Sequence, residues 1–313
     1  MCCAVSIRVA FLNSNKPQDS SQISTVSSGV GYAVLAFTAW GLLPIYWKSF
    51  GQIPPAEVLS HRILWSTLFL SGLLLIQHRN RAELARLRHA PKHLRVLLTT
   101  GLLLAFNWGL YIYAVNTNRV VETSLGYFIN PLFNVILGFV FLKERLNRGQ
   151  KIAVLLAGLG VANFIWQFRA VPAIALVLAS SFAFYGLVRK VVPVTPIVGL
   201  MVETVLVTPI ALVLIGYLAM TGTGHWGISR YTDFLFIGAG VMTSLPLLWF
   251  NNAAKRLRLA TLGFFQYIAP SLQLLLGVLL YHEPFTRTHA LSFGLIWVAL
   301  AIYSITSSTN KSV

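Results

Sequence analysis

Charged residues are scarce in this sequence, and acidic residues are the scarcest of all. Only 10% of the 313 residues are charged, whereas 56% are hydrophobic and the mean hydropathy is +0.72. Soluble domains carry roughly 25% charged residues, so this chain has too little charge to solvate its whole surface. The composition therefore excludes an ordinary soluble domain and predicts a protein that faces lipid over most of its area.

Residues for metal, redox or nucleophilic chemistry are equally rare. Cys2 and Cys3 are the only cysteines, and adjacent residues have neither the spacing of metal ligands nor that of a disulfide. No GxxxxGK[ST] loop is present for ATP, and no GxSxG or HExxH motif for hydrolysis. We expect no metal, no cofactor and no enzymatic activity.

Basic residues outnumber acidic ones by 24 to 8, which gives a formal net charge of +16. Such an excess is typical of nucleic-acid binding when it forms one continuous face. Here the charges lie in short clusters between apolar runs, as orientation signals do in multi-span membrane proteins. We therefore expect the partners to be the lipid bilayer and a small molecule, and no nucleic acid.

Apolar runs of transmembrane length occur along the whole chain. A membrane-spanning helix needs about 20 apolar residues, and only helices or closed barrels satisfy their backbone groups in lipid. These runs are continuous rather than alternating, so the predicted fold class is an all-α integral membrane protein with ten transmembrane helices. The expected spans are 30–48, 57–77, 95–116, 120–142, 151–168, 172–189, 196–219, 231–252, 259–281 and 288–307.

Three segments are expected to lie outside the spans. Residues 1–27 are polar and Ser-rich, and we expect a disordered tail without a cleaved signal peptide. Residues 308–313 are expected to form a second, short tail. The longest connection, residues 78–94, is basic and amphipathic, which predicts a segment on the membrane surface.

Lysine and arginine residues indicate the orientation in the membrane. With a cytoplasmic N-terminus, 18 of them fall on the cytoplasmic side and 5 on the opposite side, and Arg62 is left within a span. Cytoplasmic loops carry the excess of basic residues in membrane proteins. Both termini are therefore expected to be cytoplasmic.

One stretch of sequence occurs twice. The first copy reads LGYFINPLFNVILGFVFLKER (125–145) and the second reads LGFFQYIAPSLQLLLGVLLYHEP (262–284). A single offset of 139 residues pairs Pro131 with Pro270, Gly138 with Gly277, and Glu144 with Glu283. A gapless match of this kind indicates a duplicated unit.

We therefore divide the chain into two repeats, a first half at 28–168 and a second half at 172–307. Each repeat contains five expected helices, and because five is odd, the second repeat enters the membrane upside down. Inverted repeats are a mark of secondary transporters, whose substrate site lies near the midplane between the halves.

Several segments resemble a known family: HRILWS (61–66), NWGLYIYAVN (107–116), SLGYFINPL (124–132), FAFYGLVRK (182–190), RLRLATLGFFQYIAP (256–270) and IWVALAI (296–302). Together with the repeat they resemble the drug/metabolite transporter superfamily, with its EamA-type repeats, and within it the RarD branch. The resemblance covers about residues 28–307. It implies a permease of the bacterial inner membrane that moves small metabolites or drugs by export, and it leaves the substrate open.

The repeated prolines are candidate helix kinks. A proline removes one backbone hydrogen bond and clashes with the carbonyl four residues earlier, so Pro131 and Pro270 are expected to bend their helices near the middle. The released carbonyls of Tyr127 and Gln266 would suit a substrate cavity. A simple packing kink is the alternative.

Polar and aromatic side chains near these prolines are candidate substrate-binding residues. Amides combined with aromatic rings suit an amphipathic or zwitterionic organic molecule. Each residue alone fits a hydrogen bond between helices equally well. The candidates are Trp40, Asn107, Tyr111, Tyr127, Asn130, Tyr185, Trp249, Asn252, Gln266 and Tyr267.

Charges inside the spans form a second group of candidates, because they are costly in lipid and usually functional. We hypothesise that Glu203 pairs with Arg62 or His61 across the pseudo-twofold axis and takes up a proton during transport. The alternatives are a static ion pair that holds the halves together, or snorkelling of the side chain to the membrane interface. Glu144 and Glu283, at the ends of the repeated stretch, are expected to be gate or anchoring residues.

The sequence thus predicts a secondary-active permease that works by alternating access and exports a small metabolite or drug-like molecule, as a monomer or homodimer. The alternative is a lipid flippase or a lipid-active membrane enzyme. The loops are short and basic, which disfavours an enzyme, and the inverted repeat disfavours a scaffold without transport activity.

The proton hypothesis predicts that Glu203→Gln slows transport and removes its pH dependence, because glutamine has no titratable group. Flux into vesicles, measured across a range of pH, tests this expectation. A variant that keeps both the wild-type rate and the wild-type pH profile would contradict a proton role for Glu203.

Overall fold

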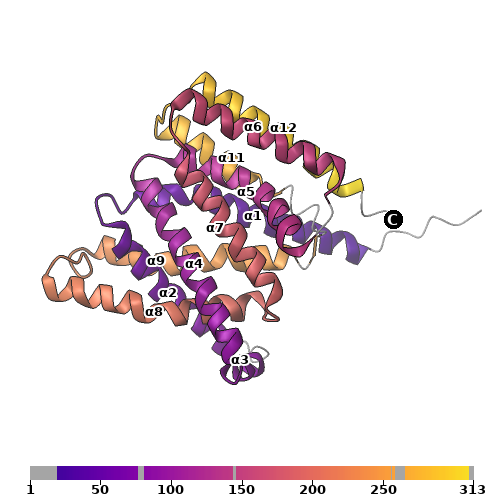
Figure 1. The fold of residues 1–313 in the computed structure, drawn as a ribbon. Helices are drawn as coiled ribbons and strands as arrows, with labels where there is room; N and C mark the ends of the chain where they lie inside the picture. The colour runs from indigo at the N-terminus through magenta and orange to yellow at the C-terminus, as the bar shows by residue number, and fades with distance from the viewer. Residues whose placement is uncertain (1–19, 77–80, 144–145, 255, 258–264, 310–313) are drawn as a thin grey trace, which may run out of the picture.

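The computed structural model describes residues 20–76, 81–143, 146–254, 256–257 and 265–309. All regular structure in these ranges is helical (Figure 1). The elements are α1 (Ser20–Lys48), α2 (Pro55–Ile76), α3 (Arg81–Arg88), α4 (Pro91–Asn116), α5 (Val120–Leu142), α6 (Arg148–Phe168), α7 (Ala173–Val191), α8 (Pro196–Thr221), α9 (Arg230–Ala254), α11 (Ile268–Leu275), the π-helix η2 (Leu276–Leu280) and α12 (Arg287–Thr309).

Within the described ranges, seven helices are long and apolar enough to cross a membrane: α1, α2, α4, α5, α6, α8 and α9. Shorter apolar segments lie in α7, in α11 with η2, and in α12. The predicted class, an all-α membrane protein, is confirmed. The count of ten spans stays a prediction, because three of the expected spans correspond to these shorter segments.

Helix α1 begins earlier than expected. It starts at Ser20, so the prediction of a disordered tail through residue 27 is wrong for residues 20–27, and residues 1–19 lie outside the described part. Once a helix is nucleated, each further residue adds one backbone hydrogen bond, which favours continuation past the apolar run. Likewise α12 extends to Thr309.

The two repeated prolines lie in different settings. Pro131 is inside α5, as predicted. Pro270 instead lies in the first turn of α11, because the chain makes a turn at Gln266 and Tyr267 before that helix begins at Ile268. The first four N–H groups of a helix have no intrahelical partner, so Pro270 removes no helical bond there. The predicted mid-helix kink at Pro270 is therefore wrong.

The helices associate mainly across the two halves of the chain. Helix α6 lies along α12 at one edge of the molecule, and α5 packs on α7 near its middle (Figure 1). Helix α1 contacts α9 and α11, α2 contacts α8 and α9, and α4 contacts α7 and α8. The first and second halves therefore form one interlocked body rather than two separate bundles.

Two of these crossings bring backbones together at a glycine. A Cβ atom on Gly240 of α9 would lie 2.5 Å from the carbonyl oxygen of Trp65 in α2. A Cβ atom on Gly101 of α4 would lie 2.9 Å from the carbonyl oxygen of Glu203 in α8. Small residues at helix interfaces permit close approach, which drives helix association in lipid. The two glycines thus set the spacing of α2 from α9 and of α4 from α8.

Gly240→Ala is expected to destabilise the protein by about 1–3 kcal/mol, because overpacking forces the two backbones apart. The control is Gly216→Ala on α8, where an added Cβ meets nothing within 4 Å. Alanine is the better helix former, so the control should leave the unfolding temperature unchanged or raise it slightly. Thermal unfolding of both purified variants in detergent is the measurement; equal effects would contradict the close crossing.

Candidate functional site

Arg62 of α2 is buried among aromatic side chains, with only 5% of its surface exposed. Its guanidinium lies over the ring of Trp108 in α4, 4.1 Å from the ring centroid, and over the ring of Trp47 in α1, at 4.8 Å. Desolvated cation–π contacts are worth about 2 kcal/mol each. Two indoles from two helices therefore hold the charged group in place.

The remaining surroundings of Arg62 are tyrosines. Tyr46, Tyr111 and Tyr127 lie within electrostatic reach of the guanidinium. The rings of Tyr111 and Tyr127 meet edge to face, with centroids 5.8 Å apart. Tyr111 is itself buried, and its hydroxyl has no hydrogen-bond partner among the described residues. The cluster is both aromatic and capable of hydrogen bonding.

In the part of the chain that the structure describes, no carboxylate pairs with Arg62 and its Nε has no hydrogen-bond partner. Burying an unpaired ion costs several kcal/mol even after the protein relaxes. Charges that persist inside membrane proteins at this expense usually mark substrate or ion pathways. Arg62 with its aromatic neighbours is thus the leading candidate site.

Glu203 of α8 has a different, fully partnered environment. The Nε of Arg189 lies 3.4 Å from its Oε1. Thr100 donates a hydrogen bond of 2.7 Å to Oε1, and the Tyr185 hydroxyl donates one of 3.2 Å to Oε2. The carboxylate is only 1% exposed, and these three donors account for its burial.

The hypothesis that Glu203 pairs with Arg62 or His61 is wrong. Arg189 is one of the 18 basic residues counted on the cytoplasmic side. Its side chain instead folds back from the last turns of α7 and packs on Gly199 of α8 to reach Glu203. His61 instead stacks on the ring of Phe236, with centroids 3.9 Å apart. A long side chain near a helix end can turn inward, and a rule that counts loop charges does not detect this.

Arg62 and Glu203 nevertheless occupy equivalent places in α2 and α8. Each lies seven residues after the proline that opens its helix. Arg62 and Glu203 are thus 141 residues apart. The same offset separates Thr67 from Thr208, whose hydroxyls hydrogen-bond to each other at 2.9 Å. The two halves therefore present opposite charges at matched positions.

The predicted substrate residues divide into several groups. Tyr111 and Tyr127 lie beside Arg62, and Tyr185 hydrogen-bonds to Glu203.

Asn107 and Asn130 form hydrogen bonds between helices. Asn107 donates to the carbonyl of Leu178 at 3.0 Å and Asn130 donates to that of Ala179 at 3.0 Å, so both tie their helices to α7.

The other predicted residues lie in different surroundings. Trp40 packs against Phe250, with ring centroids 5.7 Å apart, and Tyr267 stacks on Phe128 at 6.4 Å. Asn252 donates a hydrogen bond to the carbonyl of Leu248 in its own helix. Trp249 is half-buried on α9, and Gln266 lies in the turn before α11.

Sequence reasoning missed the two tryptophans that enclose Arg62. Trp108 has a detectable signal, because it lies three residues before Tyr111 and residues at that spacing share a helix face. Trp47 lies near the end of α1, where tryptophan is common as an interfacial anchor. Nothing in its local sequence distinguishes the two roles.

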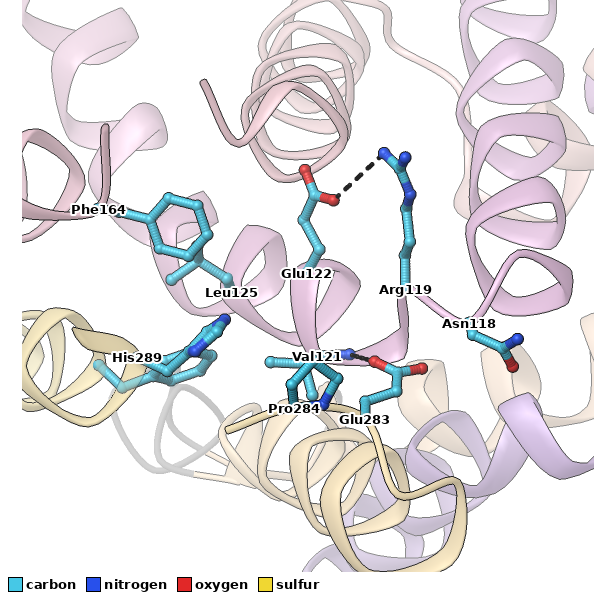
Figure 2. A pocket seen from close by; sticks show the side chains of 10 residues that line it. Asn118, Arg119, Val121, Glu122, Leu125, Phe164, Glu283, Pro284 and His289 are labelled. Carbon is cyan, nitrogen blue, oxygen red and sulfur yellow. Dashed lines mark hydrogen bonds and ion pairs between the residues drawn. The ribbon is translucent and has the colours of Figure 1, made fainter. Parts of the chain in front are cut away.

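Glu283 is an anchoring contact between the halves. Its Oε1 accepts a hydrogen bond of 2.8 Å from the N–H of Val120. Its Oε2 accepts one of 2.7 Å from the N–H of Val121 (Figure 2). A carboxylate at the first turn satisfies unpaired N–H groups and opposes the helix dipole. Glu144, the matched residue of the first repeat, lies outside the described residues.

A small pocket opens beside Glu283, and Figure 2 shows residues of α5 and α12 around it. Its volume is about 140 Å³, whereas pockets for drug-sized ligands span roughly 300–1,000 Å³. Its lining includes Asn118, Arg119, Glu122, Glu283 and His289. The pocket is too small to be the principal binding site for a drug-sized molecule.

The sequence and the fold both have known relatives. The EamA-like transporter family matches residues 27–166. An uncharacterized transporter of Vibrio cholerae is 45% identical over 88% of this chain and 92% of its own length. Protein RarD of Escherichia coli K12 is 45% identical over 88% of this chain and 93% of its own, and the uncharacterized transporter YojE of Bacillus subtilis is 42% identical over 90% and 95%.

A solved structure, described only as a crystal structure of a protein, covers 90% of this chain and 98% of its own. The two share a TM-score of 0.56 at 17% sequence identity. At that identity the likeness concerns the fold alone.

Arg189→Gln is expected to destabilise the protein by about 3 kcal/mol, because it leaves the buried Glu203 carboxylate without its counter-charge. The double variant Arg189→Gln/Glu203→Gln should recover most of the loss, since it removes both charges. Thermal unfolding in detergent measures both, with Arg169→Gln at an exposed helix end as control. A double variant no more stable than the single one would count against the ion pair.

Proposed function

The chain belongs to the EamA-like transporter family, in the RarD branch of the drug/metabolite transporter superfamily, and from that membership we propose a secondary-active permease that works by alternating access. The chain is a multi-pass membrane transporter. Its proposed task is to export a small organic molecule across the bacterial inner membrane.

The observation that carries this proposal is the twofold pattern of helix contacts. Taken in order, α1, α2, α4, α5 and α6 correspond to α7, α8, α9, α11 with η2, and α12. When each helix is replaced by its counterpart, one observed contact turns into another. The contact of α2 with α9 becomes the contact of α8 with α4, and the contact of α1 with α9 becomes that of α7 with α4. The contact of α5 with α7 likewise becomes that of α11 with α1. The pairs α2–α8, α5–α11 and α6–α12 map onto themselves. The pattern supports two repeats of five helices each.

Matched residues at the crossings support the same relation. Gly101 and Gly240 are 139 residues apart, the offset of the repeated stretch, and each marks a close crossing with the opposite half. Two halves that pack by the same contacts can exchange conformations at little difference in free energy. That exchange is the physical basis of alternating access.

Contacts between helix ends support the proposed topology of ten spans with cytoplasmic termini. Three hydrogen bonds join ends assigned to the outer side. Glu57 accepts from the N–H of His225, Glu283 accepts from the N–H of Val120, and Asn118 accepts from Lys48. One link joins ends assigned to the inner side, where Glu83 accepts from the N–H of Thr195 at 2.6 Å. None of these four links joins ends assigned to opposite sides.

The outer links also indicate how access is controlled. Glu283 belongs to the second half and caps α5 of the first half, so opening the outer side has to break this contact. Lys48, at the end of α1, lies over the ring of Tyr281 at 3.7 Å and donates a hydrogen bond to Asn118 at 2.6 Å. Helix α1 thereby contributes further contacts that hold the outer side closed. We assign Glu144 the corresponding role at the inner side, by the repeat.

Two finer questions belong to this proposal. Three donors hold the Glu203 carboxylate in place, and this arrangement fits transport that is driven by the gradient of the cargo itself. Coupling to protons through Glu203 is the competing hypothesis. A lipid flippase or lipid-active enzyme is the competing function. The family is one of transporters, and this supports transport without catalysis.

Purified protein in lipid vesicles is expected to exchange a labelled solute for the same unlabelled solute trapped inside. A panel of amino acids, nucleosides and short carboxylic acids provides the labelled probes, and protein-free vesicles are the control. A fluorescent phospholipid in the same vesicles reports flipping, and chromatography of the lipids reports conversion. Lipid flipping or conversion without solute exchange would favour the competing function.

A further inference from the structure

The two buried carboxylates on α2 and α8 are already occupied, so neither neutralises Arg62. Glu57 accepts hydrogen bonds from the backbone N–H of His225 at 2.6 Å and pairs with its Nδ1 at 2.8 Å. Glu203 is held by Arg189, Thr100 and Tyr185, as described above. The guanidinium of Arg62 therefore remains a buried cation without an anion among the described residues.

We propose that the transported molecule carries a carboxylate and that Arg62 binds it. This assignment rests on the proposed permease function and names the chemical class of its cargo. Arginine stays protonated when buried, and its planar edge matches a carboxylate with two parallel hydrogen bonds. Because Trp47 and Trp108 lie against the guanidinium, its N–H edge, with the unpartnered Nε, is the part left to bind a ligand.

The charge balance of the cluster favours a monoanion over a phosphate. Of the described residues in the cluster, only Arg62 supplies a positive charge, and its polar neighbours Tyr46, Tyr111 and Tyr127 are neutral hydroxyl groups. The nearby cation Lys48 is engaged by Asn118 and the ring of Tyr281. A doubly charged phosphate would remain half neutralised in this environment, whereas a carboxylate is matched one to one.

The aromatic side chains around the guanidinium indicate what the carboxylate is attached to. Trp47, Trp108, Tyr111 and Tyr127 place rings on three helices around one charge. Binding sites of this composition combine one precise polar contact with a hydrophobic body. The cargo class is therefore a monocarboxylate with an apolar or aromatic portion.

Binding is tested on the full chain in detergent by thermal shift, with a matched set of probes: phenylacetate, its neutral amide phenylacetamide, and the cation phenethylamine. Benzoate and hexanoate extend the carboxylates, and inorganic phosphate serves as the other anion. The carboxylates are expected to raise the unfolding temperature, since ligands that bind the folded state stabilise it. The amide, the amine and phosphate are expected to have no effect.

Variants assign the effect to Arg62. Arg62→Met is expected to abolish the shift by carboxylates while unfolding at the same or a higher temperature without probe, because it removes an unpaired buried charge. Arg62→Lys keeps the charge but loses the paired N–H edge, so carboxylates should bind roughly tenfold more weakly. Arg169→Met, at an exposed helix end, should keep the full shift.

Three results would overturn the assignment: no carboxylate raises the unfolding temperature, the amide or the amine raises it as much as the carboxylates do, or the carboxylates raise it equally in Arg62→Met. If Arg62→Met does not fold, Arg62→Lys decides, and unchanged carboxylate affinity there refutes the proposal. Vesicle flux of neutral or cationic solutes alone would reject the carboxylate and keep the permease. Carboxylate binding without flux of any solute would keep the site and reject the permease.

Discussion

Close backbone approach at small residues is the constraint on which this structure depends. Apolar side chains gain little by leaving lipid for a protein interior, so helices in a bilayer associate by tight packing and by hydrogen bonds. Gly240 admits α2 against α9, and Gly101 admits α8 against α4. Gly126 of α5 does the same for α7, because a Cβ there would lie 2.8 Å from the carbonyl oxygen of Ala175. These crossings fix where the charged residues of α2 and α8 lie.

Amide side chains add hydrogen bonds at the α5–α7 crossing and at two further crossings, α4–α7 and α1–α11. Asn107 and Asn130 donate to backbone carbonyls of α7, and Gln273 of α11 donates to the carbonyl of Trp40 in α1 at 3.2 Å. Each bond links a helix to one from the other half. A buried amide in such a protein is thus more often structural than ligand-binding, and this is why Arg62, which has no such partner, carries more functional information than the asparagines.

The sequence predicted the helices well, because lipid demands long apolar runs and such runs are directly visible. Of the ten candidate substrate residues, Tyr111 and Tyr127 lie beside Arg62, and their role in binding stays a prediction. The sequence did not predict the turn at Gln266 and Tyr267, since hydropathy averaged over a window does not register a break between apolar residues. The partner of Glu203 was missed for another reason. Arg189 lies near a helix end, and only the packing on α8 determines whether its long side chain points to water or inward.

If the two halves are repeats, as proposed, the matched positions of Arg62 and Glu203 explain how a symmetric scaffold acquires an asymmetric site. Under the proposed duplication the same backbone frame occurs twice, and the opposite charges of Arg62 and Glu203 at matched positions then differentiate the halves. The second half supplies its own counter-charge for Glu203, through Arg189. The first half supplies aromatic rings in place of a carboxylate. Lysine would not serve equally well at this position, because its compact ammonium is more strongly hydrated and loses its proton more readily when buried. Arginine keeps its charge and presents a flat face to two indoles, so the charge persists until an anion reaches its edge.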